Sequence, residues 1–185
     1  LMASGAEDSF ELIETTIKVD GSNGAVTFNN LTINQGLADT NSFSFVWRQE
    51  HGATAISAHI DFYKKYLSKE VTITIGDDFS FKGIITSIST QNHDELGVDY
   101  YILGQGMFAK LNEVSEWNSY YKKTLKQICE SLNNTQGTQL RIAPNNTDEL
   151  FYTVQYNQTV FGFYKMLATR YGEWMFYTGT ELVFG

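Results

Sequence analysis

The sequence predicts a β-rich α+β protein in which a small β-barrel domain precedes a second, α+β domain. Aromatic residues make up 15% of the 185 residues, and aromatic side chains suit the pleated surface of a sheet. Short period-two runs separated by turn signals fill the first part of the chain, whereas apolar stripes at helical spacing occur in the second part. Runs of strands followed by mixed helices and strands indicate two such domains.

The first domain is expected to cover residues 10–111. Residues 1–9, LMASGAEDS, lack the basic and apolar regions of a secretory signal, and we interpret them as a flexible leader or a cloning remnant. Six strands are expected at residues 12–19, 26–33, 42–48, 71–75, 79–89 and 98–103. The first two should pair as a hairpin, because a dense turn signal at residues 20–24 separates them. Six short strands with short turns predict a closed or nearly closed barrel.

A helical insertion is expected at residues 55–67 of this barrel. The apolar stripe that indicates it consists of Ile56, His59, Ile60, Tyr63 and Leu67. A loop with one helical turn is the alternative.

The second domain is expected to cover residues 112–185, with two helices in its core. The first helix carries the stripe Leu125, Ile128, Cys129 and Leu132, opens at the capping box of Thr124 and Gln127, and closes at residues 133–134. Short strands follow at residues 140–143 and 152–156.

The second helix carries the stripe Val160, Phe163, Tyr164, Leu167 and Tyr171. Thr159 can cap its start and Gly172 its end, and residues 174–177 and 182–184 then form a hairpin. We therefore predict a structural core of Leu125, Ile128, Leu132, Phe163, Leu167, Tyr171 and Trp174, with helix caps at Thr124 and Gly172.

Composition argues against several classes of function. The net charge is −8, and no cluster of cations is present that could neutralise nucleic-acid phosphates, so no nucleic-acid partner is expected. No apolar stretch approaches the ~20 residues that span a bilayer. The lone Cys129 lies on a helical stripe and is expected to be a buried, inert thiol.

No catalytic, cofactor or metal site is expected. The three histidines, His51, His59 and His93, have no partner at a metal-ligand spacing. Acidic pairs such as Asp77 with Asp78 lie in turn signals, where charge is ordinarily solvated. The sequence also lacks the short motifs of nucleotide binding and of serine hydrolases.

The end of the chain resembles the hub module of type VI secretion tip proteins (VgrG) and of phage tail late-control proteins. In that family a Gln-Tyr-Asn strand end leads into a helix of the form Phe-Leu-x-Arg-Leu-Ala-x-x-Tyr-Gly. The matching residues here are Gln155, Tyr156, Asn157, Phe163, Leu167, Ala168, Tyr171 and Gly172. The departures are Gln158 for Glu, Thr159 for Ser, Val160 for Asp and Met166 for Arg, which remove charges that the family commonly keeps.

Segments 83–88, 100–103 and 124–132 also match that family in order and approximate spacing, so the resemblance covers Val71 to Gly185 well and residues 10–67 weakly. It implies a structural, non-enzymatic component of the hub of a contractile injection machine, which docks the spike onto the tail tube. The implied partners are two further copies in a homotrimer, an Hcp-like tail tube, baseplate proteins and spike or effector domains. Assembly in the bacterial cytoplasm and delivery outside the cell on firing, or incorporation into a phage-like particle, are implied as well.

A different class of function stays open from the residues themselves. The aromatic excess also fits a carbohydrate- or peptide-binding β module of the adhesin kind. Such a module would present an aromatic-lined groove on a monomer and would bind its ligand with measurable affinity.

Overall fold

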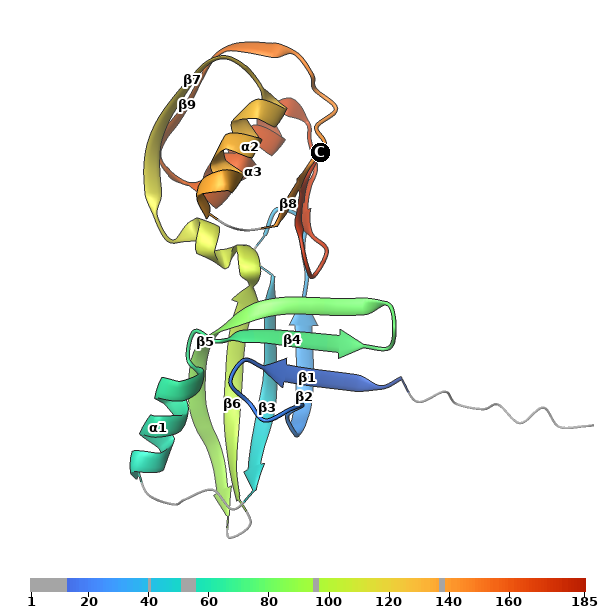
Figure 1. The fold of residues 1–185 in the computed structure, drawn as a ribbon, viewed down its shortest axis with the longest axis vertical. Helices are drawn as coiled ribbons and strands as arrows, with labels where there is room; N and C mark the ends of the chain where they lie inside the picture. The colour runs from blue at the N-terminus through green and yellow to red at the C-terminus, as the bar shows by residue number, and fades with distance from the viewer. Residues whose placement is uncertain (1–12, 40, 51–55, 95–96, 137–138) are drawn as a thin grey trace, which may run out of the picture.

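Six antiparallel strands form a curled half-barrel in the computed structural model, which describes residues 13–39, 41–50, 56–94, 97–136 and 139–185. The expected leader, residues 1–9, lies outside the described residues. The strands are β1 (Thr15–Val19), β2 (Phe28–Asn34), β3 (Ser42–Glu50), β4 (Glu70–Ile75), β5 (Phe79–Asp94) and β6 (Gly97–Gly106). Their order across the sheet is β1-β4-β5-β6-β3-β2, so β1 and β2 are its two edges (Figure 1). The predicted β-rich α+β fold with a barrel-like sheet is confirmed.

The predicted hairpin between the first two strands forms only as a short bridge, in which Lys18 pairs with Ala25 and the Val26 backbone amide donates to the Ile17 carbonyl at 2.8 Å. β1 pairs along its whole length with β4, whereas β2 pairs with β3. The register of β1 explains this choice, because it places Ile17 opposite Ile73 and Val19 opposite Val71, and all four side chains are buried. A turn signal shows where the chain reverses, but the buried face decides which strand provides the longer partner.

α1 (Ile56–Tyr66) confirms the predicted helix but buries a different face. Phe62 and Tyr66 are its buried residues, and the Phe62 ring stacks on Tyr100 with a centroid distance of 3.8 Å. Of the predicted stripe, Ile56, Ile60 and Tyr63 are 77%, 47% and 44% exposed. Both faces of α1 are apolar, so periodicity alone could not select the one that meets the sheet.

The second part of the chain builds a ribbon and a small sheet around two helices. Its elements are η1 (Met107–Asn112), β7 (Ser115–Thr124), α2 (Leu125–Gln136), β8 (Leu140–Ile142), β9 (Glu149–Thr159), α3 (Val160–Tyr171), β10 (Met175–Tyr177) and β11 (Leu182–Phe184). β7 and β9 pair as an antiparallel ribbon that arches over α2 and α3 (Figure 1). The hairpin of β10 and β11 forms as predicted and is extended by β8, which runs parallel to β11.

One strand and two element boundaries in this part differ from the predictions. β7 was not predicted as a strand, and β9 is longer than the expected residues 152–156. α2 continues through Asn133 and Asn134 to Gln136. Asparagine is tolerated inside a helix at a modest cost, so the Asn pair does not end it.

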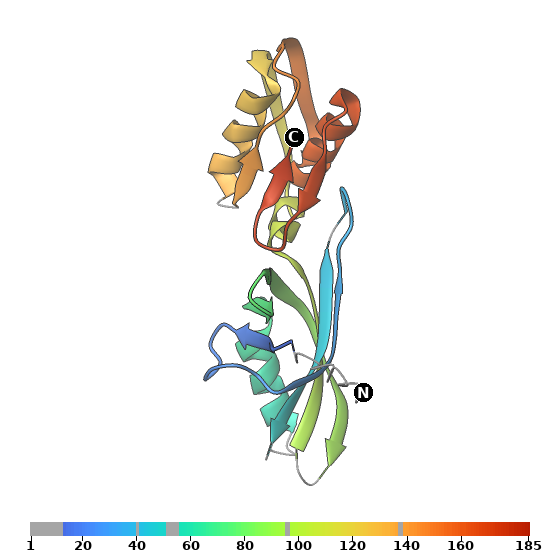
Figure 2. The same ribbon diagram turned by 90° about the vertical axis from the view of Figure 1, so that its right-hand side faces the viewer.

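The hairpin of β10 and β11 fastens the second part of the chain to the half-barrel (Figure 2). The backbone amide of Lys82 in β5 donates to the Gly179 carbonyl at 2.6 Å, and the Tyr177 hydroxyl donates to the Lys82 carbonyl at 2.8 Å. The Tyr177 ring also contacts Phe81 and Phe108, with centroids 5.6 and 5.0 Å apart. One continuous hydrophobic core therefore runs through both parts.

Glu173, directly after α3, holds the loop that follows β8. Its carboxylate accepts hydrogen bonds from the Asn146 backbone nitrogen at 2.7 Å and from the Asn145 backbone nitrogen and Nδ2, both at 3.1 Å. Burial disfavours the charged carboxylate, but the hydrogen bonds from Asn146 and Asn145 outweigh it, so the pKa of Glu173 lies below its ordinary value of 4.5.

We expect Glu173→Gln to destabilise the protein near neutral pH and to matter less in acid. A carboxyl whose pKa is lowered by folding contributes stability above its unfolded pKa and loses it as the pH falls through the folded value. Urea unfolding of both proteins near neutral pH and at about pH 3 measures this difference. An equal loss of stability at both pH values would contradict the role given to these hydrogen bonds.

Candidate docking surface

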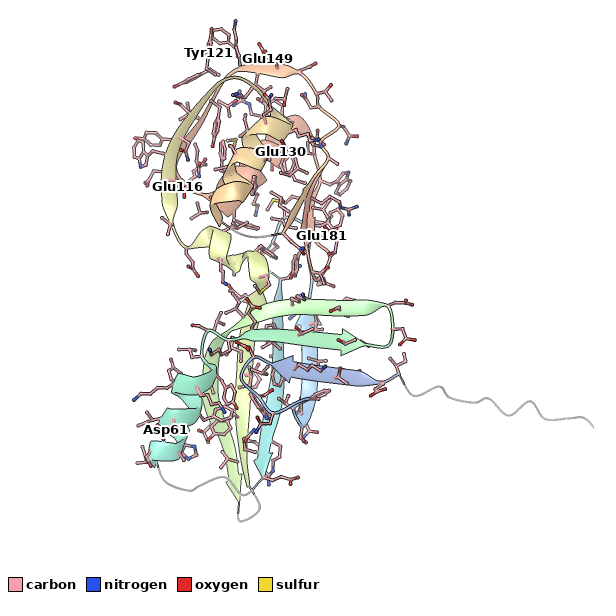
Figure 3. All side chains as sticks on the ribbon, viewed as in Figure 1. Asp61, Glu116, Tyr121, Glu130, Glu149 and Glu181 are labelled. Atoms are coloured by element: carbon pink, nitrogen blue, oxygen red, sulfur yellow. The ribbon has the colours of Figure 1, made fainter. Side chains whose placement is uncertain are left out.

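The ribbon of β7 and β9 turns a mixed set of side chains toward the helices, including Tyr120, which stacks on Phe163 of α3, and it exposes aromatic side chains on its outer side. Its register pairs Trp117 with Tyr156 and Tyr121 with Tyr152 on the outer face, and Asn118 with Gln155 on the inner face. This order follows from the period of two along each strand. Figure 3 labels Glu116 and Tyr121 near opposite ends of β7.

Five exposed aromatic side chains cluster on this ribbon, and we call them the aromatic face. They are Trp117, Tyr121, Phe151, Tyr152 and Tyr156, each 57–72% exposed. The Trp117 and Tyr156 rings meet edge to face with centroids 4.2 Å apart, and those of Tyr121 and Phe151 lie 5.3 Å apart. Lys122 Nζ lies 5.5 Å from the Tyr121 ring centroid. Apolar patches of this kind on a surface mark interaction sites.

The amide groups behind the aromatic face already bond to each other. Gln155 is fully buried; its Oε1 accepts from Asn118 Nδ2 at 2.9 Å, and its Nε2 donates to the Gln158 carbonyl at 2.9 Å. The hollow beside Trp117 and Ser119 measures only about 190 Å³, below the range of about 300–1,000 Å³ typical of small-molecule sites. The surface therefore suits protein contact better than capture of a sugar, which needs free hydrogen-bonding groups.

Most of the predicted core residues lie in the interior, and one does not. Leu125, Ile128, Leu132, Phe163 and Leu167 are buried, and Tyr171 is half-buried against the same core. Trp174 is 60% exposed, so the prediction that it is a core residue is wrong. β10 begins one residue later, at Met175, and alternation along that strand places Met175 and Tyr177 inside.

The predicted helix caps have the geometry that their sequence signals indicate. The Thr124 backbone nitrogen donates to Gln127 Oε1 at 3.1 Å, and the Gln127 backbone nitrogen donates to Thr124 Oγ1 at 3.3 Å. These two bonds are the reciprocal pair of a capping box. Gly172 has φ 69°, in the left-handed region, and its amide donates to the Ala168 carbonyl. Glycine adopts this conformation at little cost.

Two groups that carry potential chemistry are sequestered between α2 and α3. Cys129 is buried, and burial raises the pKa of its thiol to about 12. The Tyr164 hydroxyl donates to the Cys129 carbonyl at 2.9 Å, and burial also raises the pKa of this phenol. A nucleophilic cysteine needs a lowered pKa and an exposed position, so Cys129 has the surroundings of a packing residue.

Within the described residues, no three or more His, Cys, Asp or Glu side chains converge in a way that could hold a metal ion. His59 is partly buried, and its Nδ1 lies 2.8 Å from the Tyr100 hydroxyl. Over the same residues, no helix is both long and apolar enough to cross a membrane.

Sequence reasoning missed the aromatic face because it missed β7. The signal is present in residues 115–121, SEWNSYY, where Trp117, Ser119 and Tyr121 alternate with Glu116, Asn118 and Tyr120. The apolar members of such an alternation are usually buried. Here two of them, Trp117 and Tyr121, point outward.

A protein-family comparison identifies the chain. The model of the phage tail baseplate hub (GPD) family matches residues 53–184, which is most of the chain. The protein therefore belongs to the phage tail baseplate hub family, whose members are structural components of phage tail-like machines. No curated protein matches the sequence.

Solved structures share the fold at low sequence identity. The 43 kDa tail protein of prophage MuSo2 from Shewanella oneidensis is similar over 94% of this chain and 54% of its own, with a TM-score of 0.72 and 16% identity. The c3393 protein of Escherichia coli is described as a type VI secretion component similar to T4 tail proteins gp27 and gp5. It is similar over 90% of this chain and 48% of its own, with a TM-score of 0.71 and 14% identity. A structure of a Francisella PdpA–VgrG complex is similar over 93% of this chain and 31% of the matched chain, with a TM-score of 0.62 and 11% identity. The chain thus spans about half the length of the first two structures.

Proposed function

We propose that this chain forms part of the hub that docks the spike of a contractile injection machine onto its tail tube, and that it catalyses no reaction. The proposal rests on one observation above all, the family match over residues 53–184. In this proposal the chain divides between residues 111 and 112 into a half-barrel domain and an α+β domain. The buried residues Leu125, Ile128, Leu132, Phe163 and Leu167 hold the second domain rigid, so that its outer surface can bear load.

The aromatic face supports a docking role through its size. Aromatic side chains bury about 150–250 Å² each when fully covered, so five that are 57–72% exposed offer roughly 600 Å² to a partner. A standard protein–protein interface buries about 800 Å² on each partner. Tyr and Trp are also enriched at interfaces. The aromatic face is therefore large enough to supply most of one side of such an interface.

The proposed partners are those of a symmetric particle. The complete protein associates as a homotrimer, as the family resemblance implies, and a closed ring of this kind needs complementary patches on each subunit. It contacts an Hcp-like tube subunit, baseplate proteins and a spike or effector domain. It assembles in the bacterial cytoplasm and leaves the cell with the fired spike, or remains in a phage-like particle.

Incorporation into particles tests this proposal. We expect the complete protein to co-purify with the tube subunit from the same source. Removing two aromatic side chains, Trp117→Ser with Tyr156→Ser, should reduce incorporation about tenfold, because central aromatic residues dominate interface energies. The matched control is Trp174→Ser, which removes an exposed tryptophan outside the aromatic face and should incorporate normally.

Two outcomes would contradict this proposal. A complete protein that ignores the tube subunit and instead binds an oligosaccharide tightly would favour the carbohydrate-binding module. Equal incorporation of the double variant and the wild type would show that the aromatic face is not a docking surface.

A further inference from the structure

The helix α1 carries an apolar stripe that nothing in the described structure covers. Ile56, Ile60 and Tyr63 recur at i, i+4 and i+7 and remain largely exposed, while the opposite apolar face of the helix is buried on the sheet. A surface helix normally has one apolar face and buries it. A second, exposed apolar face on the same helix marks a contact with another molecule.

The stripe forms one wall of a groove, and we call this groove the α1 groove. Ile88 of β5, Tyr100 of β6 and Lys64 of α1 also line it. The groove holds a volume of about 370 Å³ and is open to solvent. Ridges of side chains spaced like Ile56, Ile60 and Tyr63 match the grooves of a second helix.

The walls of the α1 groove offer mainly apolar contact. Two polar rings that line it are paired, because His59 Nδ1 lies 2.8 Å from the Tyr100 hydroxyl. Their rings also meet edge to face at 5.8 Å. An occupant therefore inserts apolar side chains between Ile60 and Ile88.

Lys64 sets the charge of the occupant. Among the described residues that line the groove, Lys64 is the one that carries an ammonium group. No carboxylate of the described residues lies within ion-pair distance of it. Asp61, labelled in Figure 3, shares the helix but does not line the groove. A carboxylate placed next to the apolar side chains of a partner would complement Lys64 and fix its register.

We propose that the α1 groove docks an amphipathic helix from another subunit of the particle, with an acidic residue beside its apolar stripe. The apolar stripe of the partner lies against Ile56, Ile60 and Tyr63, and its carboxylate meets Lys64. This is the helix-in-groove mode of recognition. The proposal rests on the hub role in one respect, namely that the occupant belongs to the same particle.

Thiol labelling tests whether the groove is covered, and the native chain suits this method. Cys129 is buried and its thiol pKa is raised by burial, so it contributes little background. Ile60→Cys places a reporter in the groove. Lys65→Cys places a matched reporter on the exposed, opposite side of α1, away from the groove, and Tyr156→Cys reports on the aromatic face. Circular dichroism of each free variant checks folding.

We expect maleimide to label all three reporters in the free protein. In assembled particles, labelling at Ile60→Cys should fall at least about tenfold, while Lys65→Cys stays reactive. Protection at Tyr156→Cys without protection at Ile60→Cys would overturn the groove proposal alone. Reactivity of both in particles would overturn the groove proposal and would also show that the aromatic face is not a docking surface, whereas failure of the complete protein to enter particles at all would count against the hub role.

Cross-linking from Ile60→Cys then identifies the segment that covers the groove. We expect a helix-forming peptide with Asp or Glu next to an apolar stripe. A synthetic copy of that peptide should bind the wild type at least about tenfold more tightly than Lys64→Glu, because the charge reversal replaces attraction by repulsion. The control Lys165→Glu, on the exposed side of α3, should bind normally. A cross-linked segment without an acidic residue, or equal binding to Lys64→Glu, would overturn the assigned occupant.

Discussion

Leu167→Ala is expected to lower the free energy of unfolding by about 2–5 kcal/mol, as core truncations of leucine do. Leu167 is fully buried on α3. Its neighbour on the same face, Tyr164, is hydrogen-bonded to the backbone of α2 and contacts Phe184 of β11. This region has little freedom to collapse around a cavity, so the loss should be large.

Thermal and urea unfolding measure the effect on Leu167→Ala directly. The melting temperature should fall on the order of 10 °C for a chain of this size. Two controls separate cavity formation from helix propensity. Lys165→Ala changes an exposed position of the same helix and should stay within about 0.5 kcal/mol of the wild type, and Leu167→Met keeps most of the volume. Unchanged stability of Leu167→Ala would refute the packing assigned to α3.

Gly104→Val is expected to destabilise the half-barrel by about 3 kcal/mol or more, since overpacking a core already costs 1–3 kcal/mol per extra group. Phe43 is the cause. Its buried ring lies across Gly83 and Gly104 on neighbouring strands, and a Cβ at Gly104 would overlap that ring and the Ile84 carbonyl oxygen. The ring also contacts Phe45 and Phe81, so it cannot move without disturbing the rest of the core.

A double-mutant cycle separates the ring from the backbone at Gly104. Phe43→Ala alone should cost about 3–5 kcal/mol, and combining it with Gly104→Ala should cost clearly less than the sum of the two single changes. Gly36→Ala is the control, because a Cβ there would meet Asp39 Cβ at an ordinary 3.5 Å. Strict additivity of Phe43→Ala and Gly104→Ala would contradict the steric account.

The sequence predicted elements best where a pattern had one interpretation. The strand at β4 alternates Val71, Ile73 and Ile75 with two threonines, and no helix satisfies that period. The cap at Thr124 and the end of α3 at Gly172 each follow from a local hydrogen bond or dihedral angle, which a few neighbouring residues determine. Local physics of this kind can be read from sequence.

The errors arose where a distant part of the chain decides the outcome. α1 has two apolar faces, and the rings of Trp47 and Tyr100 select the face with Phe62 and Tyr66. The partner of β1 depends on a strand more than fifty residues later in the sequence. The ribbon has aromatic side chains on both sides, because Tyr120 stacks on Phe163 of α3 while Trp117 faces outward. Alternation alone does not predict exposed aromatic side chains such as Trp117, because apolar members of an alternation are usually buried.

The mass of the complete protein in solution tests the central claim most directly. Light scattering on the complete gene product should give the mass of three chains, which is the association that the family resemblance implies. The measurement needs a concentration series, because a true trimer keeps its mass on dilution through the micromolar range. A mass of one chain at every concentration would contradict the hub role proposed for this protein.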